Sequence, residues 1–234
     1  MGDDADLVEW SATYEMAEKM TTGLRILIYI SLGLPVLVVV LNTIVRIVRA
    51  FYKFPMPQFM ANVIDNPLRR RIQPPDEMPT RHGIEPGMTV LEVGPGNGAY
   101  TVTTARHVGH TGKLVTIDIE PRMIERVERR AQSEGIENIE ARVADVYDLP
   151  FEEGFFDAIY MIAVIGEIPD PEMALAEFHR VLSPSGTLAF SELLWDPDYP
   201  RARTLICRTA SAGFRLKNKV GNAFHYTLIF EKDV

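Results

Sequence analysis

The chain has 234 residues, of which 47% are hydrophobic, and this is enough for one full α/β domain with a short additional segment. Its net charge of −8 disfavours a nucleic-acid partner, because a phosphate backbone requires a basic protein face. The single cysteine, Cys207, excludes an intrachain disulfide and any zinc site built on cysteines. The five histidines are scattered along the sequence, so we expect no metal site.

The first 72 residues divide into three blocks by charge. Residues 1–25 form a short acidic segment, and residues 46–72 carry six basic side chains against one acid, Asp65. Between these blocks, the run from Ile26 to Val45 contains no charged residue. A helix rises about 1.5 Å per residue, so this run of twenty spans roughly 30 Å, the thickness of the hydrocarbon core of a bilayer.

This uncharged run predicts a retained transmembrane helix over residues 26–48. A signal peptide would begin with basic residues and end at a small-residue cleavage site, whereas this N-terminus is acidic and Arg46 follows the run directly. A buried helix of a soluble protein would keep a polar stripe, and this run is apolar all round. Pro35 predicts a kink, which is better tolerated in lipid than in water.

Basic residues predict the orientation of this helix. Arg46, Arg49 and Lys53 follow it, whereas Lys19 and Arg25 precede it. The positive-inside rule then places the C-terminal domain of a single-pass membrane protein in the cytoplasm.

Residues 49–77 are predicted to be a basic and aromatic juxtamembrane linker. Its rings predict a collar at the membrane interface, and an ordinary linker with some aromatic residues is the alternative. These rings belong to Phe51, Tyr52, Phe54 and Phe59.

Residues 78–234 alternate short apolar runs with amphipathic stretches, which predicts an α/β fold with a doubly wound, mostly parallel sheet. We expect strands at residues 89–93, 113–118, 139–143, 158–162 and 187–192, and helices at 100–108, 121–133, 171–182 and 201–212. Two further runs, 214–220 and 225–232, flank Gly221 and Asn222 and predict an antiparallel hairpin. The predicted sheet therefore has seven strands.

The stretch from Val90 to Tyr100 is an apolar run that ends in glycines at alternate positions. Gly94 and Gly96 permit backbone angles and close approaches that a Cβ would block. Asp118 ends the next predicted strand, where its carboxylate can accept hydrogen bonds from ribose hydroxyls. This combination predicts a ligand that contains adenosine.

The glycine turn alone leaves NAD open as that ligand. Gly94, Gly96 and Ala99 satisfy the dinucleotide fingerprint in its alanine variant. A dehydrogenase of this type usually carries a second substrate domain, for which we expect no room here. The remaining motifs point to another cofactor.

Five segments carry a resemblance to a known family. They are Val90-Leu-Glu-Val-Gly-Pro-Gly-Asn-Gly98, Val115-Thr-Ile-Asp-Ile-Glu-Pro-Arg-Met123, Ala144-Asp-Val146 with Leu149-Pro-Phe151, Phe156-Asp-Ala-Ile-Tyr160, and Arg180-Val-Leu-Ser-Pro-Ser-Gly-Thr-Leu188. In this order they resemble the class I S-adenosylmethionine-dependent methyltransferases. The chain is most similar to the methyltransferase type 11, or UbiE-like, group, which includes quinone-biosynthesis C-methyltransferases and bacterial phospholipid N-methyltransferases.

The resemblance implies a Rossmann-like methyltransferase fold with S-adenosylmethionine as the cofactor. Gly94, Gly96 and Gly98 would pass close to its methionine part, and Glu92 would help to hold its ammonium group. Asp118 would take the ribose hydroxyls. The alternative for Glu92 is a carboxylate that merely ends a strand.

The resemblance also implies the rest of the cofactor site. Asp145 would accept a hydrogen bond from the adenine amino group while Val146 supplies a backbone donor, although Asp145 can also serve the turn that follows it. Ile119 belongs to the same site, and Ile162 or Ala163 would line the methionine channel. The chain departs from the family at Ser185, where a glycine is frequent, and at Ile165-Gly166-Glu167, where many relatives carry histidine or asparagine.

A methyl acceptor that must lose a proton requires a base, and Glu167 and Glu192 are the candidates at the carboxyl ends of predicted strands. Carboxylates that cap the following helices are the alternative. Trp195, Tyr199 and His225 are candidates for walls of the acceptor site.

The predicted membrane anchor favours a lipid headgroup, a quinone precursor or another amphiphile at the cytoplasmic leaflet, because a tethered site meets such acceptors at high local concentration. A small soluble acceptor, with the anchor used only for localisation, is the alternative within enzymes. A cofactor-binding membrane scaffold without catalysis is a third hypothesis. The intact set of Gly94, Asp118 and Asp145 argues against this scaffold.

Overall fold

The structure, a computed structural model, describes residues 3–51 and 67–233. It divides into two compact units, Met1–Val48 and Arg49–Val234. The predicted aromatic collar, except for the helix end at Phe51, falls outside the described residues.

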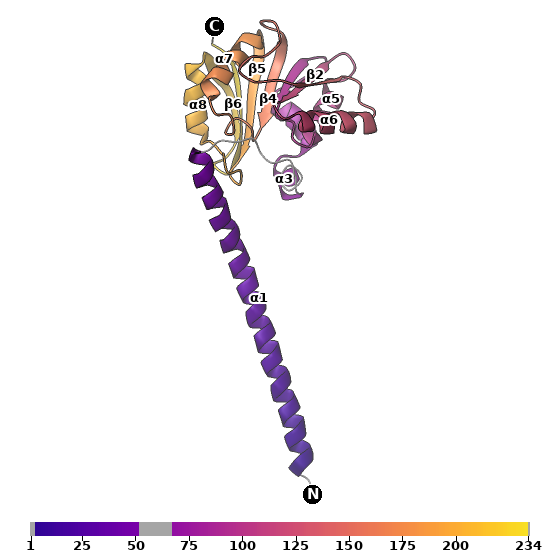
Figure 1. The fold of residues 1–234 in the computed structure, drawn as a ribbon, viewed down its shortest axis with the longest axis vertical. Helices are drawn as coiled ribbons and strands as arrows, with labels where there is room; N and C mark the ends of the chain where they lie inside the picture. Colours follow the sequence, from indigo (N-terminus) through magenta and orange to yellow (C-terminus); the bar gives the residue numbers. More distant parts are fainter. Residues whose placement is uncertain (1–2, 52–66, 234) are drawn as a thin grey trace. The chain divides into compact units, whose positions relative to one another are not determined.

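The first unit belongs to one long helix, α1, which runs from Asp3 to Phe51 (Figure 1). Residues 3–25 of the acidic segment are part of this helix, because alanine, glutamate, methionine and leucine favour helix there. Pro35 lies inside the helix. Over Glu18–Arg49, α1 is long and apolar enough to cross a membrane, with a mean hydropathy of 2.5 and none of its most apolar window buried.

The second unit contains a seven-stranded sheet in the order β3-β2-β1-β4-β5-β7-β6. Its strands are β1 (Thr89–Val93), β2 (Lys113–Asp118), β3 (Ile139–Val143), β4 (Phe156–Ile162), β5 (Leu182–Leu193), β6 (Phe214–Gly221) and β7 (His225–Lys232). The neighbours from β3 to β5 pair in parallel, and β7 pairs antiparallel with both β5 and β6. The predicted α/β fold, with its mostly parallel seven-stranded sheet, is confirmed.

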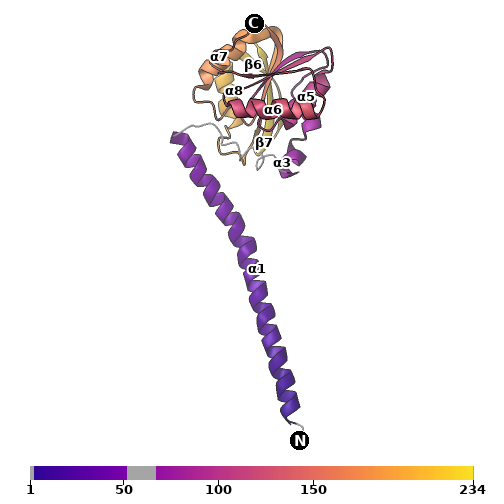
Figure 2. The same cartoon turned by 45° about the vertical axis from the view of Figure 1, so that its right-hand side comes forward.

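Helices cover both faces of this sheet. They are α3 (Pro67–Ile72), the 3-10 helix η1 (Pro75–Glu77), α4 (Met78–Arg81), α5 (Ala99–Val108), α6 (Pro121–Ser133), α7 (Pro171–Val181) and α8 (Ala202–Ser211). One core contains Phe178 of α7 and Leu205 of α8, and the other contains Met78 of α4 and Ala105 of α5. Figure 2 shows α6 across the front of the sheet, where it packs against β2 and β3.

Burial on both faces explains why the strands could be located from sequence. Successive side chains of a strand point to opposite faces, so Val90 joins one core while Leu91 joins the other. The predicted start of β5 at Thr187 was wrong. The strand begins at Leu182, because that residue pairs with Phe156 at the start of β4, and α7 accordingly ends one residue before its predicted end.

A buried polar chain links α4 to the sheet. The ring of His82, which follows α4, places Nε2 2.8 Å from Ser191 Oγ on β5, and that oxygen lies 2.7 Å from Thr227 Oγ1 on β7. The His82 ring also packs on Tyr160, with 5.1 Å between ring centroids. Burial, assisted by the positive charge of Arg81, lowers the pKa of His82 to about 3, so the ring is neutral in the folded protein.

This neutral histidine makes stability depend on pH. An unfolded chain takes up a proton on His82 below pH 6.5 and the folded chain does not, so stability is lost as the pH falls from 6.5 towards 3. The loss amounts to about 1.4 kcal/mol per pH unit, or roughly 2 kcal/mol at pH 5. Replacing His82→Gln removes this dependence while the amide can still bond to Ser191.

Thermal unfolding of the full chain in detergent, followed by near-ultraviolet circular dichroism at pH 7.5 and pH 5, measures the effect. We expect the midpoint of the wild type to fall further between the two pH values than that of His82→Gln. Equal falls would show that His82 is not buried as a neutral ring.

Candidate cofactor site

Two positions in the turn after β1 favour glycine, each for a different physical reason. Gly94 has φ of +71°, and a Cβ on it would lie 2.6 Å from Val164 Cγ2, so the close approach here is made by the protein itself. Gly96 has φ of +58°, and a Cβ there would meet nothing within 4 Å. Both angles favour glycine. The open space beside Gly96 is where a ligand can lie against the main chain.

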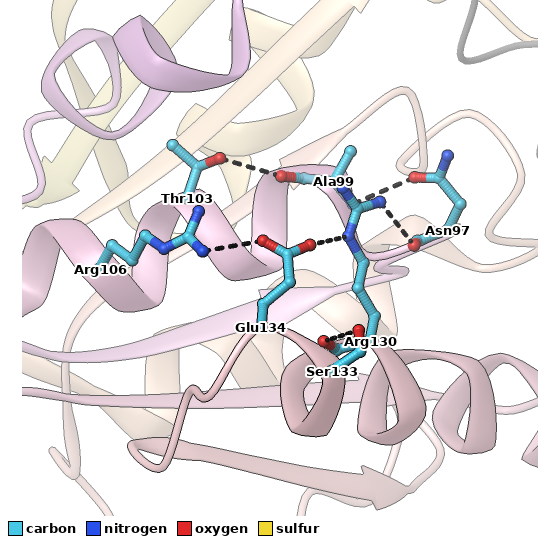
Figure 3. Close-up of polar contacts among 7 residues, drawn as sticks. All are labelled: Asn97, Ala99, Thr103, Arg106, Arg130, Ser133 and Glu134. Atoms are coloured by element: carbon cyan, nitrogen blue, oxygen red, sulfur yellow. Dashed lines mark hydrogen bonds and ion pairs between the residues drawn. The ribbon is translucent and has the colours of Figure 1, made fainter.

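A network from α5 and α6 holds this turn in place (Figure 3). The guanidinium of Arg130 donates to the main-chain oxygen of Asn97 at 3.2 Å, and the Asn97 side chain accepts from the backbone N–H of Ala99 at 3.0 Å. Glu134 lies between two arginines, accepting from Arg130 and from Arg106 at 2.9 Å each. The turn is therefore held by Arg130, which is not among the described residues that line the cavity.

A cavity of about 390 Å³ opens at the carboxyl ends of β1, β2 and β4. Its volume is in the range of small-molecule sites. Its position between β1 and β4 is the point where the strand order reverses, which is where open α/β sheets bind ligands. The predicted cofactor residues that line it are Glu92, Gly94, Gly96, Asp118, Ile119, Asp145, Val146 and Ala163.

Glu92 is a buried carboxylate at the base of this cavity. Burial raises its pKa, and a hydrogen bond from the Thr101 hydroxyl, 2.6 Å from Glu92 Oε2, opposes that rise. A buried carboxylate is costly unless a positive group or hydrogen-bond donors compensate it. The side chain therefore fits the ammonium group of the predicted cofactor.

Asp118 ends β2 and is partly buried at the edge of the cavity. One of its oxygens accepts from the backbone N–H of Glu120 at 2.9 Å, which orients the carboxylate. Burial raises the pKa of Asp118, and the bond from Glu120 opposes the rise. The position suits the predicted bond to ribose hydroxyls.

Two other loops contribute the remaining predicted residues. Asp145 lines the cavity and also accepts from the backbone N–H of Tyr147 at 3.0 Å, so it holds its own turn as well as facing the ligand space. Ala163, directly after β4, has φ of 58°, an unusual angle for a residue with a Cβ. Such a conformation costs of order 1 kcal/mol and marks a constrained position in the cavity wall.

Arg180 of α7 holds the loop that carries Asp145. Its guanidinium donates to the main-chain oxygens of Phe151 at 2.7 Å and Leu149 at 2.9 Å, while Glu177 accepts from the backbone N–H of Leu149 at 3.0 Å. Arg180 and Glu177 therefore hold the loop in place through its main chain at Leu149 and Phe151.

Two predicted residues are not among the described residues that line the cavity. Gly98 has φ of 77° and is the N-cap of α5, where a Cβ would lie 3.3 Å from Arg130 Cδ. Glu192 is 1% exposed on β5, and burial raises its pKa well above the usual range. Glu167, in contrast, does line the cavity.

Several lining residues were not predicted as part of this site, and Arg69 of α3 is one of them. Its guanidinium carbon lies 5.9 Å from the ring centroid of Tyr100, which also lines the cavity. The run Arg69 to Arg71 belongs to the basic block at residues 46–72, from which no cavity residue was predicted. No local pattern links α3 to a turn some 25 residues further along the chain.

Residues 91–190 match the family of methyltransferase domains. This part of the chain is a methyltransferase domain. Among curated proteins, it is 37% identical over 108 residues to a 2-phytyl-1,4-naphtoquinone methyltransferase of Nostoc, which covers 46% of this chain and 47% of that protein. It is 34% identical over 119 residues to the ubiquinone/menaquinone biosynthesis C-methyltransferase UbiE of Escherichia coli, covering 49% and 47%.

A demethylmenaquinone methyltransferase of Staphylococcus aureus is 34% identical over 110 residues, covering 47% of this chain and 45% of that protein. The chain thus spans about half the length of these relatives. Among solved structures, a SAM dependent methyltransferase from Aquifex aeolicus superposes with a TM-score of 0.70 at 23% identity, covering 75% of this chain and 98% of that one. That likeness supports the fold.

These comparisons confirm the predicted methyltransferase domain and S-adenosylmethionine as its cofactor. They decide against NAD, which the glycine turn alone had left open. The residues of the cavity also suit this cofactor. Gly96 leaves open space, Glu92 offers a buried carboxylate that can pair with an ammonium group, and Asp118 is an oriented acceptor at the strand end.

We expect Asp118→Asn to weaken the binding of S-adenosylmethionine. The substitution replaces a charged acceptor of two ribose hydroxyls, and hydrogen bonds to charged groups contribute about 1.5–3 kcal/mol, so the dissociation constant should rise by about ten- to a hundredfold. Titration calorimetry of the full chain in detergent measures it.

Asp148→Asn is the matched control, because Asp148 is exposed on the next loop and is not among the described residues that line the cavity. Its dissociation constant should equal that of the wild type. Equal affinities in all three proteins would remove Asp118 from the cofactor site.

Proposed function

We propose that this protein is an S-adenosylmethionine-dependent methyltransferase that is held at a membrane by α1 and methylates a lipidic acceptor at the cytoplasmic face. The acceptor is a quinone precursor or a phospholipid headgroup. The observation that carries the proposal is the presence, in one chain, of a methyltransferase domain and a helix apolar enough to cross a bilayer. Such a tether raises the effective concentration of membrane acceptors, on the order of millimolar for short linkers.

Two further observations support a lipidic acceptor. Three of the similar curated proteins are named as methyltransferases of quinones or their precursors. The cavity also has apolar walls that suit an apolar or aromatic acceptor. These walls include Ile117, Ile119, Met123, Ile162, Val164 and Ile168.

When bound, S-adenosylmethionine supplies an electrophilic methyl group on a positively charged sulfur. The residues of this chain have three tasks: they position the two reactants, exclude water and receive a proton where the acceptor atom carries one. Glu92, Asp118 and the glycine turn serve the first task on the cofactor side, and the apolar walls serve the second.

For the third task we propose Glu167. Its carboxylate lines the cavity, as a base must if it is to reach the acceptor. Glu192 is a weaker candidate, because its side chain is buried on β5 and is not among the described residues that line the cavity. Burial also raises the pKa of Glu192 well above its usual range.

Isosteric amides separate the two glutamates. Glu167→Gln should lower kcat by at least about a hundredfold, the usual contribution of a general base. Glu192→Gln should keep kcat within about threefold of the wild type, because Glu192 is not among the described residues that line the cavity. Both variants should bind S-adenosylmethionine normally, and the opposite pattern of kcat would assign the base to Glu192.

Transfer of a labelled methyl group tests the substrate class. The full chain, reconstituted in vesicles made from extracted bacterial membrane lipids, is incubated with methyl-labelled S-adenosylmethionine, and the products are analysed by mass spectrometry. We expect one added methyl on a quinone-type lipid or on a phospholipid headgroup.

The Asp118→Asn protein is the control for enzyme-dependent label. Label found only on water-soluble compounds supplied as a cytosolic extract would favour the small soluble acceptor. Binding of the cofactor without transfer to either fraction would favour the non-catalytic scaffold.

A further inference from the structure

The loops beside the cofactor cavity expose large apolar side chains. Trp195 is 61% exposed after β5, Phe224 is 67% exposed in the turn between β6 and β7, and Val220 near the end of β6 is 43% exposed. Since β5 runs parallel to β1 and β4, Trp195 lies at the edge of the sheet where the cavity opens, and the next residue, Asp196, lines that cavity. These side chains therefore stand beside the cavity mouth.

Hydrogen bonds fix the turn that presents Phe224. The backbone N–H of Leu194 donates to the Phe224 oxygen at 2.7 Å, which joins the loop of Trp195 to the turn. The Asn222 side chain accepts from the backbone N–H of Phe224 at 2.8 Å, and the Tyr199 hydroxyl donates to the Ala223 oxygen at 2.6 Å. The exposed rings are held on a braced surface.

Basic side chains flank this surface although the domain as a whole is acidic. Lys219 lies next to Val220 on β6, and Arg201 follows Pro200, whose oxygen accepts from the Tyr226 hydroxyl at the start of β7. Both are exposed, and neither has an ion pair among the described residues. The acids nearest in sequence, Asp196 and Asp198, are buried or half-buried.

Helix α3 adds a second apolar and basic element at the same edge (Figures 1 and 2). Its Leu68 and Arg71 are exposed, while Arg69 lines the cavity. Apolar and basic side chains thus occur on two elements at the cavity edge, the β6–β7 turn and α3.

We propose that the surface formed by Trp195, Val220 and Phe224 with Lys219 and Arg201, here called the hairpin rim, docks on an anionic lipid bilayer. The inference rests on the proposed function and adds how the cavity meets its lipid. Aromatic rings suit the headgroup region, and lysine and arginine are attracted to anionic lipids.

A bilayer fits this rim better than a protein partner does. The same chain carries a helix that can cross a membrane, so the domain is covalently tied to any membrane that this helix spans. A small hairpin rim is enough to orient a tethered domain on the bilayer, because the tether replaces most of the binding affinity that a free domain would need. Docking through this edge turns the cavity mouth towards the lipid.

Fluorescence of Trp195 tests the docking. The chain contains two tryptophans, so the full chain with Trp10→Phe reports on Trp195 alone. It is reconstituted in phosphatidylcholine vesicles with phosphatidylglycerol, with or without bromine atoms on the upper acyl chain. We expect the brominated lipid to lower the emission by about twofold, since bromine quenches only rings at the interface.

Two variants in the Trp10→Phe background locate the contact. Phe224→Ser with Lys219→Ser should abolish most of the quenching. Phe155→Ser should leave it unchanged, because Phe155, 42% exposed, precedes β4 at the opposite edge of the sheet. Circular dichroism and binding of S-adenosylmethionine verify that each variant is folded.

Equal emission with and without bromine would overturn the docking, as would quenching that is the same in all variants. A blue shift of Trp195 that grows with protein concentration and ignores bromine would instead show contact with a second copy, and would also overturn it. Quenching requires no turnover, so it is independent of the methyl-transfer experiment. Transfer without quenching removes only the docking, and quenching without transfer removes only the proposed function.

Discussion

The close approach of Val164 to Gly94 is the contact on which the site depends. It brings the turn after β1 against the loop after β4 at the point where the strand order reverses, and any Cβ at position 94 would occupy the same space. Because the turn is pressed against the protein there, its open side at Gly96 faces the cavity. The same geometry sets Glu92 and Ala163 on neighbouring walls.

Two arginines outside the cavity keep its loops in that arrangement. Arg130 holds the glycine turn at Asn97, and Arg180 holds the loop of Asp145 at Leu149 and Phe151. Each guanidinium donates to main-chain oxygens, so the loops are fixed whatever side chains they carry. This explains why the segment from Arg180 to Leu188 accompanies the glycine turn in the sequence resemblance although it contributes no residue to the described lining of the cavity.

The sequence was sufficient for the central strands because strands buried on both faces are continuous apolar runs, and β1 and β2 have the predicted bounds. β7 and the edge strand β3 have them too, although no residue of β3 is fully buried. The same reasoning located Asp118, which ends such a run, whereas Asp145 was predicted only from the family resemblance. Features that tertiary contacts decide lie beyond such patterns. Arg69 enters the cavity from a short helix with no periodicity of its own, and no local pattern reports the burial of Glu192.

Charge constrains how such a domain can meet an anionic membrane. The whole chain has a net charge of −8, the basic block at residues 46–72 has +5 and residues 1–25 have −4, so the remainder has −9. An anionic surface therefore repels most faces of this domain. Screening limits that repulsion to about 8 Å at physiological salt, so orientation is decided by the face nearest the lipid. An exposed edge with basic and aromatic side chains is then favoured over the acidic remainder. The tether supplies proximity, and the distribution of charge selects which edge faces the bilayer.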